Sequence, residues 1–480
     1  MNNDILYDDI INPTDNLGQN KSNNTNPTNF IKTFDYDNVA ITDIVNSIIV
    51  DSIDKSASDI HFNPTEDGII VRIRIDGELR NYANVPGHVK KNMITRIKIL
   101  AGMNITESRI PQDGAIKQKI LDKDVDLRVS SLPTNMGENI VIRILDYTMS
   151  SQGIDTLGFN DTNLKKIIKV IEQPNGIILV TGATGSGKST TVYSILQRLN
   201  TIDRNIITVE DPIEMNIPGI NQVQVISDIG LTFAASLRSI LRQDPDIIMI
   251  GEIRDDETAK IAVRASITGH LVLSTIHTNS ALNTIERLLD MNIERYLLGT
   301  ALAGIISQKL CKKLCPYCRS ARPTNDYEKK VFKNSLNLEI NEIYEANGCD
   351  KCHEGFTGRI AIHEVLTINQ QIRDAITNNV KKEDLRDLVY GAGTISMLQD
   401  GLTKVINGDT TFEELIKAIE IDDTDLTSKG LTESLEIAEK NKDVLKNDEN
   451  IKKIVEQNDA DYEVFDLDFL NSWLAVFFRI

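Results

Sequence analysis

Residues 176–199 constrain the fold more than any other stretch of the chain. The apolar run at 177–180 predicts a buried strand, and it leads directly into a glycine-rich loop of the form G-x-x-x-x-G-K-[ST]. Apolar residues at helical spacing from Val192 to Leu199 then predict a helix. A glycine turn that matches by chance is the alternative, and the flanking strand and helix argue against it. The loop comprises Gly182, Ala183, Thr184, Gly185, Ser186, Gly187, Lys188, Ser189 and Thr190.

These residue types suit a nucleotide phosphate. Glycines allow successive backbone N–H groups to curl around phosphate oxygens, and the helix that follows presents its N-terminus to the anion. Lys188 supplies a positive charge for the β- and γ-phosphates, and the Ser189 hydroxyl can ligate Mg²⁺. The loop therefore predicts a site for a nucleoside triphosphate with Mg²⁺.

The length of the chain fits two or three domains, and its charge narrows the choice of partners. The chain has 480 residues and a formal net charge of −18. This acidic balance argues against a broad nucleic-acid-binding face, so no nucleic acid partner is expected. Neither a secretory signal nor a run of about 20 apolar residues is recognisable, which favours a cytoplasmic location.

The first part of the chain predicts a small α+β domain over residues 39–150. Residues 1–38 are polar and rich in Asn, Asp and Thr, which is typical of a disordered arm. Helical spacing follows at 41–49 and again at 89–100, and strands are expected on either side of Asp67-Gly68 and of the loop that holds Pro133 and Gly137. Arg128 and Arg143 fall on the last two of these strands.

Residues 151–421 predict a second domain with a parallel sheet. Beyond the strand at 177–180, nearly continuous apolar runs at 205–210, 247–251 and 271–275 alternate with helical patterns. Such strands are buried on both faces, as in α/β folds. Ligands of these sheets bind at the carboxyl ends of the strands.

Acids and histidines stand near those ends. Glu210 closes one strand and Glu252 follows another, and a carboxylate at a sheet edge about 60 residues after a phosphate loop is placed to reach Mg²⁺ or its water. His277 follows the third strand and could sense the terminal phosphate, whereas His270 precedes that strand and could equally cap it.

The cysteines predict a metal centre. Two C-x-x-C pairs, Cys315 with Cys318 and Cys349 with Cys352, stand about 30 residues apart, and four thiolates at this spacing can close a tetrahedral Zn²⁺ site within a subdomain at 311–363. Reduced structural cysteines are the alternative. Cys311 lies outside the pairs and is expected to be a small buried side chain.

Taken in order, four segments resemble a known family. GATGSGKSTT, ITVEDPIE, LRSILRQDPDIIMIGEIRDDETA and TGHLVLSTIHTN are similar to the Walker A, Asp-box, Walker B and His-box segments of the secretion ATPases of type II secretion and type IV pili. The match extends upstream through SASDIHF, RIDGEL, RIKILAGMNITESRIPQDG and SLPTNMGENIVIRIL, and covers about residues 40–420.

The resemblance implies a RecA-like P-loop ATPase domain, a smaller PAS-like α+β domain before it, and an inserted tetracysteine subdomain. It also implies a homo-hexamer with ATP between subunits, which moves an inner-membrane platform protein and so associates peripherally with the cytoplasmic membrane. By this resemblance, Glu252 is the acidic Walker B residue and Glu210 competes with it as the group that activates water. His270 and His277 match the His-box positions. The arginine positions that resemble nucleotide or inter-subunit contacts are Arg128, Arg143, Arg238, Arg242 and Arg359.

The tetracysteine motif resembles that of assembly and secretion ATPases, which favours extension of type IV pili over retraction. A type II secretion or DNA-uptake pseudopilus motor shares the same motor residues and stays open, and a nucleic-acid translocase or a non-catalytic scaffold is less favoured. The acidic segment 422–480 ends in a cluster of large apolar residues, and we expect it to pack on its own ATPase domain or to anchor a partner or membrane surface.

Overall fold

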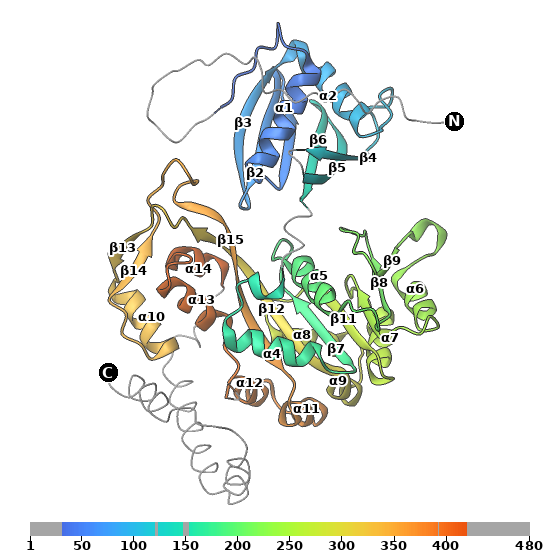
Figure 1. Cartoon of the computed structure of the whole chain (residues 1–480), viewed down its shortest axis with the longest axis vertical. Helices are drawn as coiled ribbons and strands as arrows, with labels where there is room; N and C mark the ends of the chain where they lie inside the picture. Colours follow the sequence, from blue (N-terminus) through green and yellow to red (C-terminus); the bar gives the residue numbers. More distant parts are fainter. Residues whose placement is uncertain (1–30, 121–122, 147–152, 392, 420–480) are drawn as a thin grey trace, which may run out of the picture.

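The computed structural model describes residues 31–419 except 121–122, 147–152 and 392, and a few side chains beside those gaps. The expected terminal segment at 422–480 and most of the expected N-terminal arm lie outside the described residues. Within the described part, a smaller domain precedes a larger one that carries a lateral lobe (Figure 1).

The smaller domain is a six-stranded antiparallel sheet packed under two helices. Its strand order is β3-β2-β1-β6-β5-β4. Alternation along Gly68–Ile75 buries Val71, Ile73 and Ile75 and turns Arg72 and Arg74 to the other face, as the period-2 pattern predicts. Phe34 and Tyr36, which precede Val39, also pack on this core. The elements are α1 (Ile41–Asp54), β1 (Asp59–Pro64), β2 (Gly68–Ile75), β3 (Glu78–Pro86), α2 (Gly87–Leu100), β4 (Gln112–Ile120), β5 (Lys123–Thr134) and β6 (Gly137–Asp146).

The larger domain is organised on a seven-stranded sheet in the order β15-β12-β7-β11-β10-β8-β9, in which β15 alone runs antiparallel to its neighbour. The parallel strands are β7 (Gly176–Thr181), β8 (Ile206–Glu210), β9 (Asn221–Gln224), β10 (Ile247–Ile250), β11 (Leu271–Ile276) and β12 (Leu302–Leu314), and β15 is Phe356–Thr367. Strands β7, β8, β10 and β11 are buried along their whole length, which explains their continuous apolar sequences.

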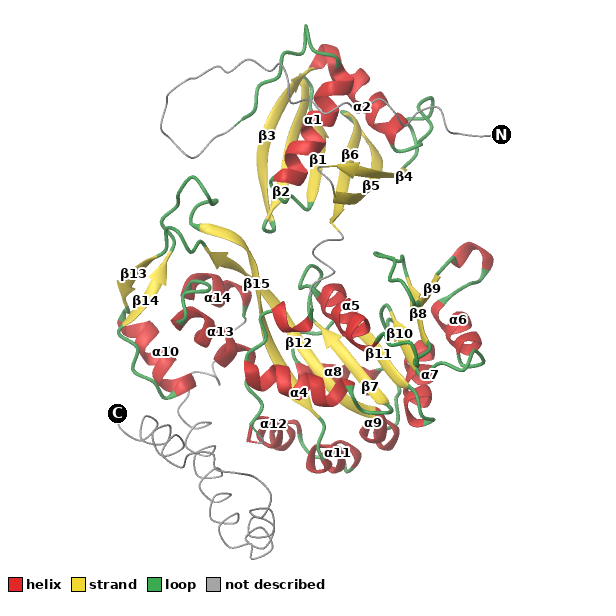
Figure 2. Cartoon of the chain, viewed as in Figure 1, coloured by secondary structure: helices red, strands yellow, loops and turns green. Residues whose placement is uncertain are grey.

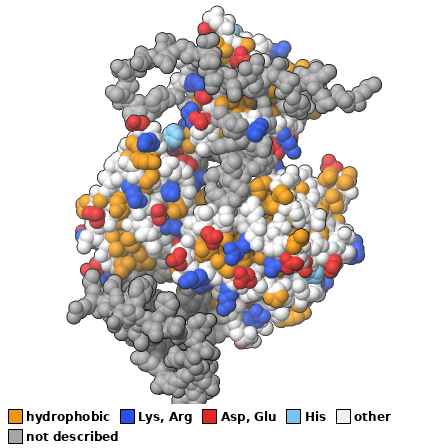
Figure 3. All heavy atoms as spheres, in the orientation of Figure 1, with side chains coloured by type: hydrophobic (Ala, Val, Ile, Leu, Met, Phe, Trp, Pro, Cys, Tyr) orange, Lys and Arg blue, Asp and Glu red, His pale blue; other side chains and the backbone are white. Residues whose placement is uncertain are grey.

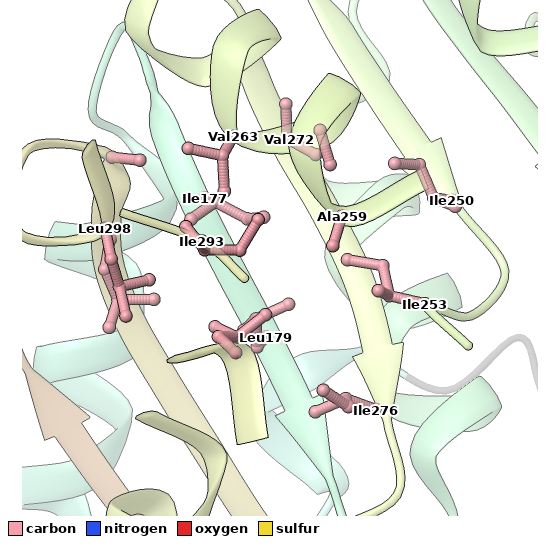
Figure 4. Packing of buried hydrophobic residues seen from close by; sticks show 14 of the residues in the cluster. Ile177, Leu179, Ile250, Ile253, Ala259, Val263, Val272, Ile276, Ile293 and Leu298 are labelled. Carbon is pink, nitrogen blue, oxygen red and sulfur yellow. The ribbon is translucent and has the colours of Figure 1, made fainter. Parts of the chain in front are cut away.

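Helices cover both faces of this sheet (Figure 2). One face packs against α4 (Asp161–Ile171) and α5 (Lys188–Leu199). The other face packs against α6 (Phe233–Ile240), α7 (Asp256–Ile267), α8 (Ala281–Asp290), α9 (Arg295–Ala301), α11 (Gln370–Thr377) and α12 (Lys382–Gly391). Figure 4 shows this second core, where Ile177 and Leu179 of β7 meet Val263 of α7 and Leu298 of α9.

The lateral lobe is built on β12 and β15, which extend beyond the sheet as a long antiparallel pair. Between them lie β13 (Ser320–Pro323), α10 (Asp326–Leu336) and β14 (Glu342–Glu345), and α13 (Met397–Ile406) and α14 (Phe412–Ala418) pack against this excursion around Phe332 and Leu402. The lobe thus combines an inserted segment with helices that follow the sheet.

Candidate functional site

The glycine-rich loop lies between β7 and α5, at the carboxyl edge of the parallel sheet. Gly182, Gly185 and Gly187 all have positive φ, at 153°, 78° and 87°. A Cβ on Gly182 would lie 2.4 Å from both the carbonyl oxygen of Gln308 and the Ser186 hydroxyl, so the loop has no room for a side chain there. Helix α5 begins at Lys188, and the N–H groups of its first three residues, 188–190, have no intrahelical acceptor.

Lys188 is folded over this loop. Its Nζ donates to the carbonyl oxygens of Gly182 and Ala183, each at 2.9 Å, and the residue is only 9% exposed. Burial lowers the pKa of Lys188, while the charges of Glu252 and Glu214 act in the opposite direction and favour the ammonium. The acids whose charges act on Lys188 are therefore Glu252, beyond the end of β10, and Glu214, beyond the end of β8.

Glu252 follows β10, and its charge acts on Lys188 of the loop. Its carboxylate accepts a hydrogen bond from Arg254, and the Nε2 atom of His277 lies 3.5 Å from its Oε2 atom. The Glu252 side chain is 17% exposed and that of His277 is 50% exposed. Glu252 and His277 thus meet at the ends of β10 and β11, where water can reach both side chains.

Glu210 has a different environment. It is 3% exposed at the end of β8, and its carboxylate accepts hydrogen bonds from Thr208 Oγ1 at 2.6 Å, from Gln222 Nε2 at 3.0 Å and from the Tyr193 hydroxyl. Burial and the Glu210 charge raise the pKa of Tyr193 well above its usual value. The Tyr193 oxygen also accepts from the backbone N–H of Glu214 at 3.2 Å. Glu210 therefore ties α5, β8 and β9 together.

The two histidines lie at opposite ends of strand β11. His277 follows β11 at the carboxyl edge, whereas His270 precedes β11, and its carbonyl accepts from the N–H of Gly176 at the start of β7. The Nδ1 atom of His270 lies 2.9 Å from the carbonyl oxygen of Ala265. His270 thus caps the amino end of the strand, which is the alternative that its position before the strand left open.

The five candidate arginines lie on both domains. Arg128 and Arg143 are cross-strand neighbours on β5 and β6; Arg128 donates to the carbonyl of Ile213 in the larger domain at 2.8 Å, and Arg143 donates to Asp59 at 3.2 Å. Arg238 pairs with Glu257, Arg242 donates to the Arg238 carbonyl, and Arg359 is exposed on β15. Within the single chain, Arg128 thus joins the two domains, Arg143, Arg238 and Arg242 contact groups of their own domains, and Arg359 is exposed.

The four cysteines of the two pairs converge in the lobe. The Sγ atoms of Cys315, Cys318, Cys349 and Cys352 all lie within 4.8 Å of one another. Contacts of 3.9 Å between Cys315 and Cys349 and of 3.6 Å between Cys318 and Cys352 are far longer than a disulfide bond. A tetrahedral zinc centre with Zn–S bonds of about 2.3 Å has an S···S edge of about 3.8 Å, so the arrangement fits that metal.

Cys311 is separate from this centre. It is 2% exposed, its Sγ contacts the carbonyl of Glu414, and burial raises its pKa to about 12. The thiol therefore behaves as a small buried side chain, as expected from the sequence.

Three further side chains contribute to the site, although the sequence motifs did not single them out. Gln308 on β12 donates a hydrogen bond to the Ser186 carbonyl of the loop. Tyr193 on α5 donates to Glu210, and Arg254 donates to Glu252. The position of Arg254 two residues after a strand-end acid is a signal that sequence could offer. Gln308 offers none, because its role depends on the pairing of β12 with β7.

The fold and the site together define the class of protein to which this chain belongs. A phosphate loop follows one parallel strand, and an acid follows a second strand that is separated from the first by β11. This is a RecA-like P-loop nucleotide hydrolase.

The chain belongs to the Type II/IV secretion system protein family, which matches residues 35–417. It is 46% identical over 375 residues to the "Putative type II secretion system protein E" of Escherichia coli (strain K12), covering 78% of this chain and 76% of that protein. It is 43% identical over 382 residues to the "Type IV pilus assembly ATPase PilB" of Thermus thermophilus, covering 79% of this chain and 43% of that protein.

Solved structures agree with this placement. The pilus retraction motor PilT with bound ADP aligns with a TM-score of 0.55 and 28% identity over 79% of this chain and 97% of that one. The Legionella pneumophila ATPase DotB aligns with a TM-score of 0.60 and 23% identity over 81% and 98%, which supports the fold. The chain is therefore an ATP hydrolase of the secretion and pilus ATPase family. Among the described residues, the helices are too short or too polar to traverse a bilayer.

Proposed function

We propose that this chain hydrolyses Mg²⁺-bound ATP as a homo-hexamer and uses the energy to assemble a type IV pilus at the cytoplasmic face of the membrane, through an inner-membrane platform protein. The observation that carries the proposal is that the phosphate loop with Lys188 follows β7 and that Glu252 follows β10, so both lie at the carboxyl ends of the parallel strands. The ADP bound in the PilT structure supports the choice of nucleotide.

Each residue has a role in this proposal. The loop residues 182–190 would hold the phosphates and Lys188 would offset part of their charge. Ser189 and Glu252 would hold Mg²⁺, which would supply further positive charge against the phosphates. Glu252 is the favoured base for the attacking water, since three donors already occupy Glu210. His277, beside Glu252, is suited to respond to the terminal phosphate.

The arginines act between subunits in this proposal. Arg128, Arg143, Arg238, Arg242 and Arg359 would approach a nucleotide held by a neighbouring subunit and stabilise the charge that develops on the transferred phosphoryl group. The exposure of the Arg143 side chain, at 67%, and of the Arg238 side chain, at 52%, supports contacts outside the single chain. Zn²⁺ is the metal proposed for the four cysteines.

A type II secretion motor is the second candidate, favoured by the relatives of that name at up to 46% identity. A nucleic-acid translocase is less favoured, because acidic and basic side chains are interspersed on the face shown in Figure 3 rather than separated into a basic stripe. A scaffold without activity is disfavoured by the presence of both Lys188 and Glu252.

The test compares Glu252→Gln with Glu286→Gln. Glu286 is a partly exposed acid of α8 that pairs with Lys382. We expect Glu252→Gln to lower the ATPase turnover of the assembled protein at least hundredfold and Glu286→Gln to leave it within twofold. In cells that depend on this chain, counts of surface pili and assays of secreted proteins separate the two candidate functions. Normal ATP hydrolysis by Glu252→Gln would refute the assignment of the site.

A further inference from the structure

Strand β12 brings a glutamine against the back of the phosphate loop. It pairs in parallel with β7 up to Ser307, which lies opposite Thr181, the last residue before the loop. The next residue is Gln308, which is 1% exposed. A polar side chain so deeply buried needs hydrogen-bond partners for its whole amide group.

Both the nitrogen and the oxygen of the Gln308 side-chain amide form hydrogen bonds. The Gln308 Nε2 atom donates to the carbonyl oxygen of Ser186 at 2.7 Å, and its Oε1 atom accepts from the Thr191 hydroxyl at 2.8 Å. Ser186 belongs to the loop, and Thr191, which is 2% exposed, belongs to the first turn of α5. One side chain therefore fastens the loop to the helix that follows it.

Gln308 also explains two glycines of the motif. A Cβ on Gly182 would lie 2.4 Å from the Gln308 carbonyl oxygen, and a Cβ on Gly187 would lie 3.1 Å from its Nε2 atom. Both glycines also have positive φ. The loop thus contacts Gln308 at two points. Gly182 lies against the backbone carbonyl of Gln308, and Gly187 lies against its side-chain amide.

The hydrogen bond from Gln308 to the Ser186 carbonyl also fixes the direction of the Gly187 N–H, which belongs to the same peptide group. The Ser186–Gly187 peptide is planar and trans, so its C=O and N–H point in opposite directions. Because Gln308 holds the Ser186 carbonyl toward the sheet, the N–H of Gly187 is directed away from the sheet, at the N-terminus of α5 where an anion binds.

We propose that Gln308 is a positioning residue that orients the Gly187 N–H for a nucleotide phosphate and keeps the loop open in that orientation. The inference rests on the proposed function of the loop and adds a residue from outside the motif. It requires an amide at position 308, because the site needs a donor for Ser186 and an acceptor for Thr191 at once.

The experiment measures binding of a fluorescent ADP with Mg²⁺ to the full chain. Gln308→Met keeps the length of the side chain and removes both hydrogen bonds. The matched control is Gln399→Met, since the amide of Gln399 likewise donates to a carbonyl, that of Ser335 at 3.1 Å, and accepts a backbone N–H, that of Ser396 at 3.0 Å. We expect affinity at least tenfold weaker for Gln308→Met and unchanged within twofold for Gln399→Met.

Gln308→Glu supplies a second readout. An ionised carboxylate accepts only and repels the Ser186 carbonyl, whereas the neutral acid can donate to Ser186 and accept from Thr191. The affinity of Gln308→Glu relative to the unmodified chain should therefore rise as the pH falls through the pKa of the introduced carboxyl. If Gln308 had a merely structural role, the melting temperature of Gln308→Glu would recover over this pH range, but the ADP affinity of the folded variant would equal that of the unmodified chain throughout.

The outcomes separate this inference from the proposed function. If the unmodified chain binds no ADP, the proposed function fails. If it binds ADP and Gln308→Met binds equally well, only the role of Gln308 is overturned. Should Gln308→Met fail to fold, Thr191→Val decides the question: weaker binding that Thr191→Ser restores supports the inference, and unchanged binding overturns it.

Discussion

A buried histidine makes the stability of the larger domain sensitive to mild acid. His363 on β15 is fully buried, its ring stacks on Phe159 with centroids 3.8 Å apart, and neither ring nitrogen has a hydrogen-bond partner. Its pKa lies well below the usual value, mainly because of burial and also because of the charge of Lys404. Asp400, which pairs with Lys404, accepts the backbone N–H of His363 at 2.8 Å.

The direction of the effect follows from linkage. The unfolded chain takes up a proton at a pKa of about 6.5, while the folded chain resists protonation, so stability is full above that pH and is lost as the pH falls. Between pH 7.5 and 5.5 the loss from this one residue is about 1.4 kcal/mol. For a domain of this size, that corresponds to a decrease of about 3–6 °C in melting temperature.

Thermal unfolding of the unmodified chain and of His363→Phe at both pH values isolates this contribution. Phe preserves the stack on Phe159 and has no proton to gain, so the variant should lose about 1.4 kcal/mol less on acidification. His88→Gln, which alters a side chain that is 58% exposed, serves as the control and should behave like the unmodified chain. Equal acid sensitivity of His363→Phe and the unmodified chain would refute the reasoning.

Three further predictions concern the candidate site. Glu210→Gln should lower the free energy of unfolding by about 2 kcal/mol, since three donors lose a charged acceptor, yet should lower turnover less than tenfold; a hundredfold loss without destabilisation would make Glu210 the base instead. Cys318→Ser should lose one equivalent of zinc by elemental analysis and melt at a lower temperature, while Cys311→Ser keeps the metal; equal zinc in both variants would contradict the proposed centre. Arg143→Ala should lower the ATPase activity of the assembled protein at least tenfold without changing ADP affinity in dilute protein; full activity would remove its role between subunits.

The central strands of the larger sheet could be predicted because burial on both faces leaves a continuous apolar run. Strands β7, β8, β10 and β11 meet that condition. The edge strands β9 and β15, and β12 beside β15, could not be recognised in this way. Strand β9 has the polar sequence NQVQ, and β12 becomes polar where it leaves the sheet.

The two histidines show that residues of one short sequence segment can lie far apart in the fold. His270 and His277 belong to one resembling segment, but a strand rises about 3.3 Å per residue, so seven residues carry the chain about 23 Å across the sheet. His277 therefore lies beside Glu252 and His270 lies at the far edge. Gln308 illustrates the converse, since it lies far from the loop in the sequence and contacts it only because β12 pairs with β7.

The choice between Glu210 and Glu252 depends on hydrogen bonding that sequence cannot supply. Both acids follow apolar strands, and both strands end at the same sheet edge. A carboxylate offers about four lone-pair sites, and Glu210 gives three of them to Thr208, Gln222 and Tyr193 in a buried setting. Glu252 binds Arg254 and retains solvent access, so it alone of the two can accept a proton from water without breaking a buried network. The residue types are identical, and it is the partners of each side chain that favour Glu252 as the base in the proposed function and Glu210 as a structural residue.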